Sequence, residues 1–121
     1  MLTTRDIGNA GETCAAEYLE ECGYEILERN YKLSFGEIDI IALSPEDICV
    51  FVEVKTRKSD RFGLACEAVD RRKQEHIIRA AMTYGFEGDK RFDVIEVYYR
   101  DENGFSAERI NHIENAFENF F

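Results

Sequence analysis

The sequence predicts an α/β fold in which a mixed sheet is flanked by helices in the order αβββαβ. Two segments, 9–22 and 67–84, have the apolar spacing of amphipathic helices. Three strand-like segments lie between them and another follows the second helix, which is typical of a sheet covered by helices. The length of 121 residues and the 45% hydrophobic content are those of a folded domain, so we expect a single domain over 1–121.

The first half of the chain is expected to hold one helix and three strands. Over residues 9–22 the apolar side chains fall on one stripe at about 100° per residue, which predicts the first helix. Strands are expected at 24–33, 37–43 and 48–56. The second and third strands are rich in Ile and Val and are joined by the short turn 44–47, so they should form an antiparallel hairpin.

The second half is expected to complete the sheet. The second helix, 67–84, should end at Gly85, and a fourth strand is expected over 91–99. A short fifth strand near 106–110 would follow a turn. The apolar residues of the last segment, 111–121, have helical spacing, so this segment is expected to be a short helix or tail.

The composition argues against several classes of protein. No apolar run approaches the ~18 residues that span a bilayer, so we expect neither a membrane partner nor a signal peptide. The four cysteines contain no C-x-x-C pair and are interpreted as reduced thiols of a cytoplasmic protein. The formal net charge of −10 argues at first against a nucleic-acid partner. We assign no role to the histidines, His76 and His112.

The charge is unevenly distributed along the chain. The window 55–73 holds seven basic and three acidic side chains, a balance of +4, whereas the remainder holds eight basic and 22 acidic ones. This window is either a patch that binds phosphates or an ordinary solvated face, and the cluster alone does not decide.

The predicted hairpin brings two carboxylates together. If Ile41 pairs with Phe51, then Asp39 lies directly opposite Glu53, with Cβ atoms roughly 4.5–5.5 Å apart. Two half-buried carboxylates repel each other, and a divalent cation such as Mg²⁺ would relieve the repulsion. Lys55 on the same face would add a fixed positive charge. The alternative is a solvent-facing hairpin that carries ordinary exposed charges.

Both predicted helices offer further charged side chains. Glu12 and Glu21 each lie just beyond one edge of the first helix's apolar stripe, and position does not choose between them. Lys73 lies within the apolar stripe of the second helix. It therefore either extends to solvent or meets a buried acid or a phosphate.

Three motifs together carry a family resemblance. They are Gly8-x-x-Gly11-Glu12, Gly36-Glu37-Ile38-Asp39-Ile40-Ile41-Ala42 and Phe51-Val52-Glu53-Val54-Lys55-Thr56-Arg57. With them the chain resembles the YraN family of bacterial proteins up to about Val97. More remotely it is similar to the archaeal Holliday junction resolvases and to PD-(D/E)xK nucleases. The resemblance implies a restriction-endonuclease-like αβββαβ core.

The resemblance also implies an activity and a site. The implied function is metal-dependent hydrolysis of DNA phosphodiesters by an endonuclease that recognises branched or damaged DNA, with DNA rather than RNA as partner. The implied catalytic residues are Glu12, Asp39, Glu53 and Lys55. Mg²⁺ or Mn²⁺ would be held by Asp39 and Glu53 with Glu12 as ligand or support, which decides between the two helix glutamates. Lys55 would act as general base or as an electrostatic clamp. The residue before the motif aspartate is Ile38, where the superfamily motif has proline.

Five basic residues are expected to hold the DNA backbone on either side of the site: Arg57, Lys58, Arg61, Arg72 and Lys73. Two other functions stay open. One is a non-catalytic nucleic-acid-binding module that keeps the nuclease fold. The other is a protein-interaction domain in which the aromatic tail, with Phe117, Phe120 and Phe121, forms a docking face or a homodimer contact.

Overall fold

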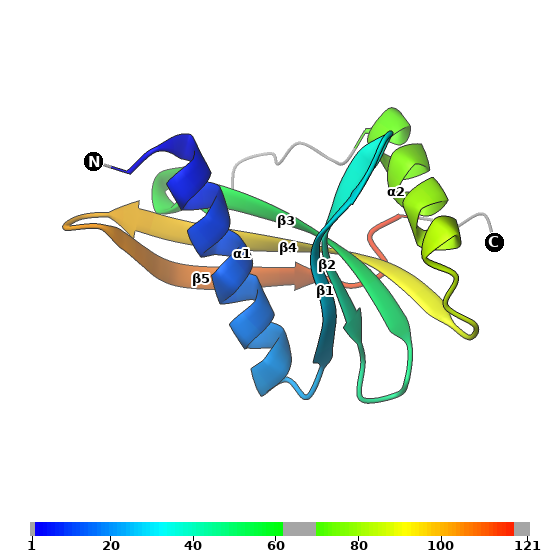
Figure 1. Ribbon diagram of the computed structural model, residues 1–121. Coiled ribbons are helices and arrows are strands. Elements are labelled where there is room, and N and C mark those ends of the chain that lie inside the picture. The colour runs from blue at the N-terminus through cyan, green and yellow to red at the C-terminus, as the bar shows by residue number, and fades with distance from the viewer. Residues whose placement is uncertain (1, 62–69, 118–121) are drawn as a thin grey trace.

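The computed structural model describes residues 2–61 and 70–117, and within them the chain forms a five-stranded mixed sheet with two flanking helices (Figure 1). The strand order is β1-β2-β3-β4-β5, in which only β3 and β4 are parallel. This arrangement confirms the predicted αβββαβ core. The elements are α1 (Thr4–Glu21), β1 (Glu25–Leu33), β2 (Gly36–Leu43), β3 (Cys49–Lys58), a 3₁₀ turn (Ser59–Arg61), α2 (Arg71–Tyr84), β4 (Lys90–Asp101) and β5 (Phe105–Ile113).

Helix α1 begins five residues before the expected start at residue 9. Thr3 and Asp6 form a capping box: the Thr3 hydroxyl accepts a hydrogen bond from the Asp6 N–H, and the Asp6 carboxylate accepts one from the Thr3 N–H. Most of residues 4–10 are at least partly exposed, so the first turns carry no apolar stripe. Periodicity therefore detects only the part of the helix that packs on the sheet.

Helix α2 begins at Arg71 and not at residue 67. Asp70 has an extended backbone and its carboxylate accepts a hydrogen bond from the Lys73 N–H, so it is the N-cap. Residues 67–69 of the expected helix lie outside the described residues. The C-terminal end agrees with the expectation, because Gly85 adopts the left-handed conformation (φ 75°) that ends many helices.

The described part of 111–121, a segment expected to be a short helix or tail, forms no helix. Strand β5 continues to Ile113, and residues 114–117 are not helical. The reason is a tertiary contact, in which the Asn115 N–H donates to the Asp93 carboxylate at 3.0 Å. The Phe117 ring then stacks on Phe92, with 5.1 Å between ring centroids. Phe117 thus packs within the molecule, and residues 118–121 lie outside the described part.

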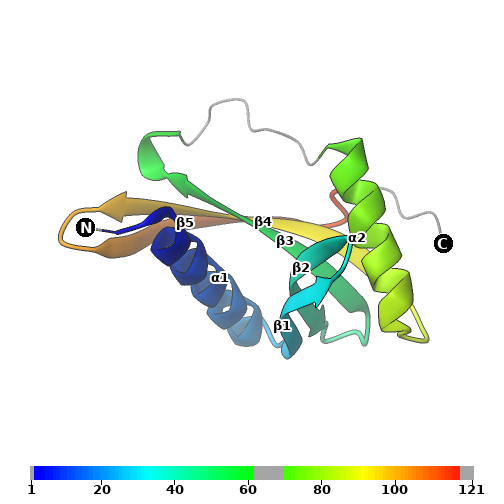
Figure 2. The same ribbon diagram turned by 45° about the horizontal axis from the view of Figure 1, so that its top comes forward.

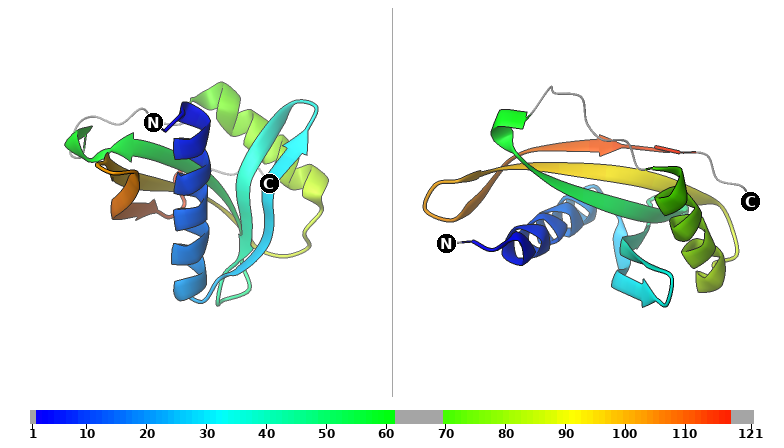
Figure 3. Two further views of the ribbon diagram at one scale, coloured as in Figure 1. Left: turned by 60° about the vertical axis from the view of Figure 1, so that its left-hand side comes forward. Right: turned by 90° about the horizontal axis from the view of Figure 1, so that it is seen from above.

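Two apolar layers cover the two faces of the sheet, and α1 and α2 lie on either side of the β1–β2 hairpin in the right-hand view of Figure 3. Alternation along β2 and β3 separates the layers, because neighbouring residues of a strand point to opposite faces. The α1 layer includes Ala15, Leu19, Ile40, Val50, Val52 and Ile95. The α2 layer includes Ile41, Phe51, Ile77, Ala81 and Phe92. Among the described residues no helix is long and apolar enough to cross a bilayer.

Strands β2 and β3 separate partway along their length. The predicted register is confirmed, since Ile41 pairs with Phe51, but the pairing stops at Ile40 and Val52. Strand β2 continues to pair with β1 as far as Gly36, so the hairpin tip leaves β3 and extends beside α2 (Figure 2). This fork is the feature that positions the candidate site.

Candidate active site

Asp39 lies where the fork opens. The strands separate one residue before Asp39 and Glu53 would pair, so the two are not partners in the sheet. Instead the Asp39 Oδ2 atom accepts a hydrogen bond from the Val54 N–H at 2.8 Å. The carboxylate takes the place of the main-chain acceptor that β2 no longer offers, and this bond fixes its orientation.

Glu53 is the most buried carboxylate of the fork, with 5% of its side chain exposed. Its Oε1 atom lies 2.6 Å from the Lys73 Nζ and 3.6 Å from the Lys55 Nζ. Lys73 therefore meets a buried acid, which is one of the two outcomes predicted for a lysine in an apolar stripe. Burial alone would lower the pKa of Lys73, but the hydrogen bond and charge of Glu53 raise it.

Glu12 reaches the fork because α1 approaches β3 closely at the preceding residue. A Cβ atom added at Gly11 would lie 2.9 Å from the Thr56 Cγ2 and would overlap the Thr56 hydroxyl. Glycine is therefore required at this contact, which carries Glu12 to the site. Glu12 lies beside Glu37 and Asp39, whereas Glu21 is exposed, and the assignment of Glu12 to the site stays a prediction.

Three carboxylates converge at the fork. One oxygen of each of Glu12, Glu37 and Asp39 lies within 4.8 Å of the other two. Glu37 was not among the predicted site residues, although it shares a strand face with Asp39 two residues away, and this signal could have found it. The predicted ligand set of Glu12, Asp39 and Glu53 stays a prediction, and in this structure Glu53 is paired with lysine.

The electrostatics of these groups suit a hard divalent cation. Burial, and after it the charge of Glu53, raises the pKa of Asp39 to about 8. Burial, and after it the charge of Glu37, raises the pKa of Glu12. The Glu12 Oε1 atom is also buried and has no hydrogen-bond partner among the described residues. Mutually repelling carboxylate oxygens are the donors that Mg²⁺ and Mn²⁺ prefer, so these residues fit such an ion.

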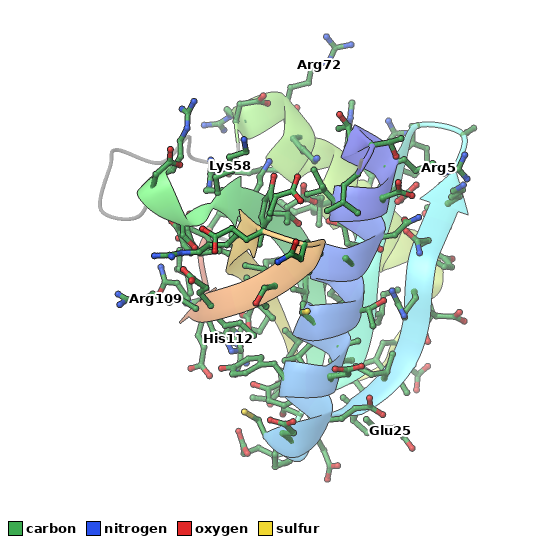
Figure 4. The ribbon with its side chains drawn as sticks, turned by 90° about the vertical axis from the view of Figure 1, so that its left-hand side faces the viewer. Arg5, Glu25, Lys58, Arg72, Arg109 and His112 are labelled. Atoms are coloured by element: carbon green, nitrogen blue, oxygen red, sulfur yellow. The ribbon has the colours of Figure 1, made fainter. Side chains whose placement is uncertain are left out.

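The predicted phosphate-binding residues divide into two groups. Arg57 is held against the sheet, since its Nε lies 3.1 Å from the Glu96 Oε2 and 22% of its side chain is exposed. Lys58, Arg61 and Arg72 are exposed. Figure 4 shows Lys58 and Arg72 projecting at the same end of the molecule. Lys73 is also exposed, but it forms an ion pair with Glu53, so Arg57 is the one of the five that is mostly covered.

The structure contains a second buried polar cluster, around Asp93, that sequence reasoning missed. The fully buried Asp93 carboxylate accepts hydrogen bonds from Arg91 at 2.9 Å and lies 2.7 Å from the His112 Nε2. The His112 Nδ1 in turn lies 2.9 Å from the Tyr18 hydroxyl. Burial alone would raise the pKa of Asp93, but these bonds hold it below its usual value. This network ties α1 to β4 and β5, and we interpret it as structural.

The model of the Uncharacterised protein family UPF0102 matches residues 11–97. The chain belongs to the UPF0102 (YraN) family. A UPF0102 protein of Caldanaerobacter subterraneus subsp. tengcongensis is 49% identical over 118 residues, covering 93% of this chain and 95% of that protein. UPF0102 proteins of Caldicellulosiruptor saccharolyticus and Clostridioides difficile are 46% and 45% identical, each covering 96% of this chain and all of that protein. The matched UPF0102 segment contains all the carboxylates of the fork.

Proposed function

We propose that this protein hydrolyses phosphodiester bonds of DNA in a metal-dependent reaction, as an endonuclease directed by branched or damaged structure. The observation that carries the proposal is the convergence of Glu12, Glu37 and Asp39 beside Glu53 and its two lysines. Acidic groups that hold a divalent ion, next to a fixed ammonium group, are the elements that phosphoryl transfer requires.

The carboxylates of the fork would hold the ion, with Asp39 and Glu12 as the best placed. Asp39 is oriented by the Val54 N–H, and Glu12 offers a buried oxygen that has no hydrogen-bond partner in the described part of the chain. A bound Mg²⁺ or Mn²⁺ ion polarises a phosphoryl oxygen and lowers the pKa of water bound to it. Because Asp39 is fixed by a main-chain contact, little side-chain entropy is lost when the site is used.

Lys55 supplies positive charge where the reaction develops negative charge. Its Nζ lies 3.6 Å from the Glu53 Oε1 and 29% of its side chain is exposed, so it can face both the carboxylate and a substrate. We therefore assign Lys55 the role of an electrostatic clamp on the phosphoryl oxygens rather than that of the base.

The exposed basic residues account for DNA binding. Lys58, Arg61 and Arg72 contact phosphates and read no bases, so recognition would depend on DNA structure and not on sequence. The net charge of −10 repels DNA from the other faces. Binding should therefore be weak and sensitive to salt.

A cleavage assay tests the proposal directly. The purified protein is incubated with duplex, nicked and four-way-junction DNA in Mg²⁺, Mn²⁺ or EDTA. Glu53→Gln and Lys55→Met should abolish metal-dependent cutting, whereas Glu87→Gln, at an exposed glutamate outside the fork, should leave it unchanged. Circular dichroism of each variant controls for folding.

The same assay separates the remaining functions. DNA binding without cutting in every metal would replace the proposal with a non-catalytic binding module. Absence of both binding and cutting at low salt would leave the protein-interaction domain. Cutting that persists in Glu53→Gln would remove Glu53 from the mechanism.

A further inference from the structure

Lys73 is a cation that the protein itself places in the acidic fork. It extends from the first turn of α2, and its Nζ lies 2.6 Å from the Glu53 Oε1. The same oxygen lies 3.6 Å from the Lys55 Nζ. Glu53 is thereby neutralised in the absence of metal, which explains how a carboxylate with 5% exposure is tolerated in an apolar sheet.

The Lys73 side chain can move from Glu53 into an adjacent groove. It is 45% exposed, and it lines a groove of about 380 Å³ between α2 and the tip of β2, together with Arg72, Glu37 and Asp39. A lysine on a flexible four-carbon stem can change partner within such a groove without moving the helix. Because Glu53 is only 5% exposed, the lysine can leave only when another cation takes over the neutralisation of that carboxylate.

We propose that Lys73 is a positioning residue that occupies Glu53 in the metal-free protein and is displaced when a divalent cation binds the fork, so that its ammonium becomes free to contact a substrate phosphate. This inference rests on the proposed function, because it takes the fork as a metal site that acts on a phosphodiester. The displacement of Lys73 would make metal binding and phosphate binding depend on each other.

Charge supplies the physical reason. Four carboxylates meet at the fork, Glu12, Glu37, Asp39 and Glu53, and the two lysines contact only the last of them. A divalent ion that takes an oxygen of Glu53 repels the ammonium already bound there. The released lysine lies on the groove that Arg72 also lines, where a substrate phosphate would be within its reach.

Calorimetric titration with Mn²⁺ alone, without DNA, tests the first half of the inference. Lys73→Met should bind Mn²⁺ about ten-fold more tightly than the wild type, which corresponds to loss of one competing charged hydrogen bond of ~1.4 kcal/mol. Lys73→Arg keeps a cation on Glu53 and should bind no more tightly than the wild type. Lys55→Met removes the same charge at a longer distance and should give a smaller gain.

The outcomes separate this inference from the proposed function. If neither the wild type nor any variant binds Mn²⁺, the metal site of the proposed function is wrong. If the wild type binds Mn²⁺ but Lys73→Met gains no more than Lys55→Met, the metal site stands and the competition at Glu53 is wrong.

Fluorescence anisotropy of labelled duplex DNA tests the second half. In EDTA, where Lys73 is held by Glu53, Lys73→Met should bind DNA as the wild type does. In Mn²⁺ it should bind more weakly than the wild type. Arg72→Met, at a neighbouring exposed residue, should weaken binding in both conditions. Equal weakening by Lys73→Met with and without Mn²⁺ would overturn the release of the lysine.

Discussion

The Asp39 carboxyl should make the metal-free protein less stable as the pH rises. Asp39→Asn is the sharpest perturbation, because the amide oxygen can still accept the hydrogen bond from the Val54 N–H while the charge is removed. Any change in the pH dependence of unfolding then reports on the charge and not on the loss of a contact.

The sign follows from the pKa of Asp39, which burial and the charge of Glu53 raise from 3.8 to about 8. Between these values the folded protein holds a proton that the unfolded chain has released. The stabilisation is complete below about pH 4 and is lost as the pH rises through 8. About four pKa units would correspond to ~6 kcal/mol, and solvent screening of this half-buried group reduces the expected effect to ~2–3 kcal/mol.

Urea unfolding in EDTA, followed by circular dichroism, measures this effect. At about pH 4.5 we expect Asp39→Asn and the wild type to differ little in free energy of unfolding, and at about pH 8 we expect the variant to be more stable by ~2–3 kcal/mol. Asp89→Asn makes the same change of charge at an exposed position and should show no such trend. The reasoning is refuted if the difference between Asp39→Asn and the wild type does not vary with pH.

Three further predictions follow from the packing and charge of named residues. Gly11→Ala should destabilise the fold by ~1–3 kcal/mol in urea unfolding, because its Cβ would overlap Thr56. Gly8 has open space around it, so Gly8→Ala should instead stabilise α1 by ~0.5–1 kcal/mol. Equal effects of Gly8→Ala and Gly11→Ala on stability would contradict the close contact between Gly11 and Thr56. Binding of Mn²⁺ near pH 7 should release about one proton, chiefly from Asp39. Calorimetry in buffers of different ionisation enthalpy detects this release as a binding heat that varies with the buffer. Asp39→Asn should lose that variation. Asp93→Ala should cost ~3–5 kcal/mol, because it removes the fully buried carboxylate that pairs with both Arg91 and His112. A loss below ~1 kcal/mol in the same unfolding assay would mean that the network is not a structural clamp.

Local pattern was enough to predict most of the fold. The alternation of apolar residues along β2 and β3 has a period of two, so one pairing buries both strands and a slip by one residue exposes them. For this reason the register of Ile41 with Phe51 was predictable. The start of α1 was not, because its first turns face solvent and carry no periodic signal.

The candidate site was predictable in its residue types and only partly in its partners. Asp39 and Lys73 could be recognised as charges at positions that should be apolar. That Lys73 binds Glu53, and that Arg57 binds Glu96 39 residues away, depends on distances between elements that no local pattern contains. Glu37 joins Glu12 and Asp39 only because the hairpin tip diverges from β3.

The sequence by itself therefore determined the order of the elements, the pairing of β2 with β3 and the chemical character of the site, because these follow from periodicity and from the cost of burying charge. Only the tertiary structure decided which charged side chains form ion pairs and where β2 separates from β3. It also decided that Asp93 and His112 form a buried pair. Those features depend on desolvation and Coulomb interactions between segments far apart in the chain. Such interactions exist only once helices and strands are packed at defined distances.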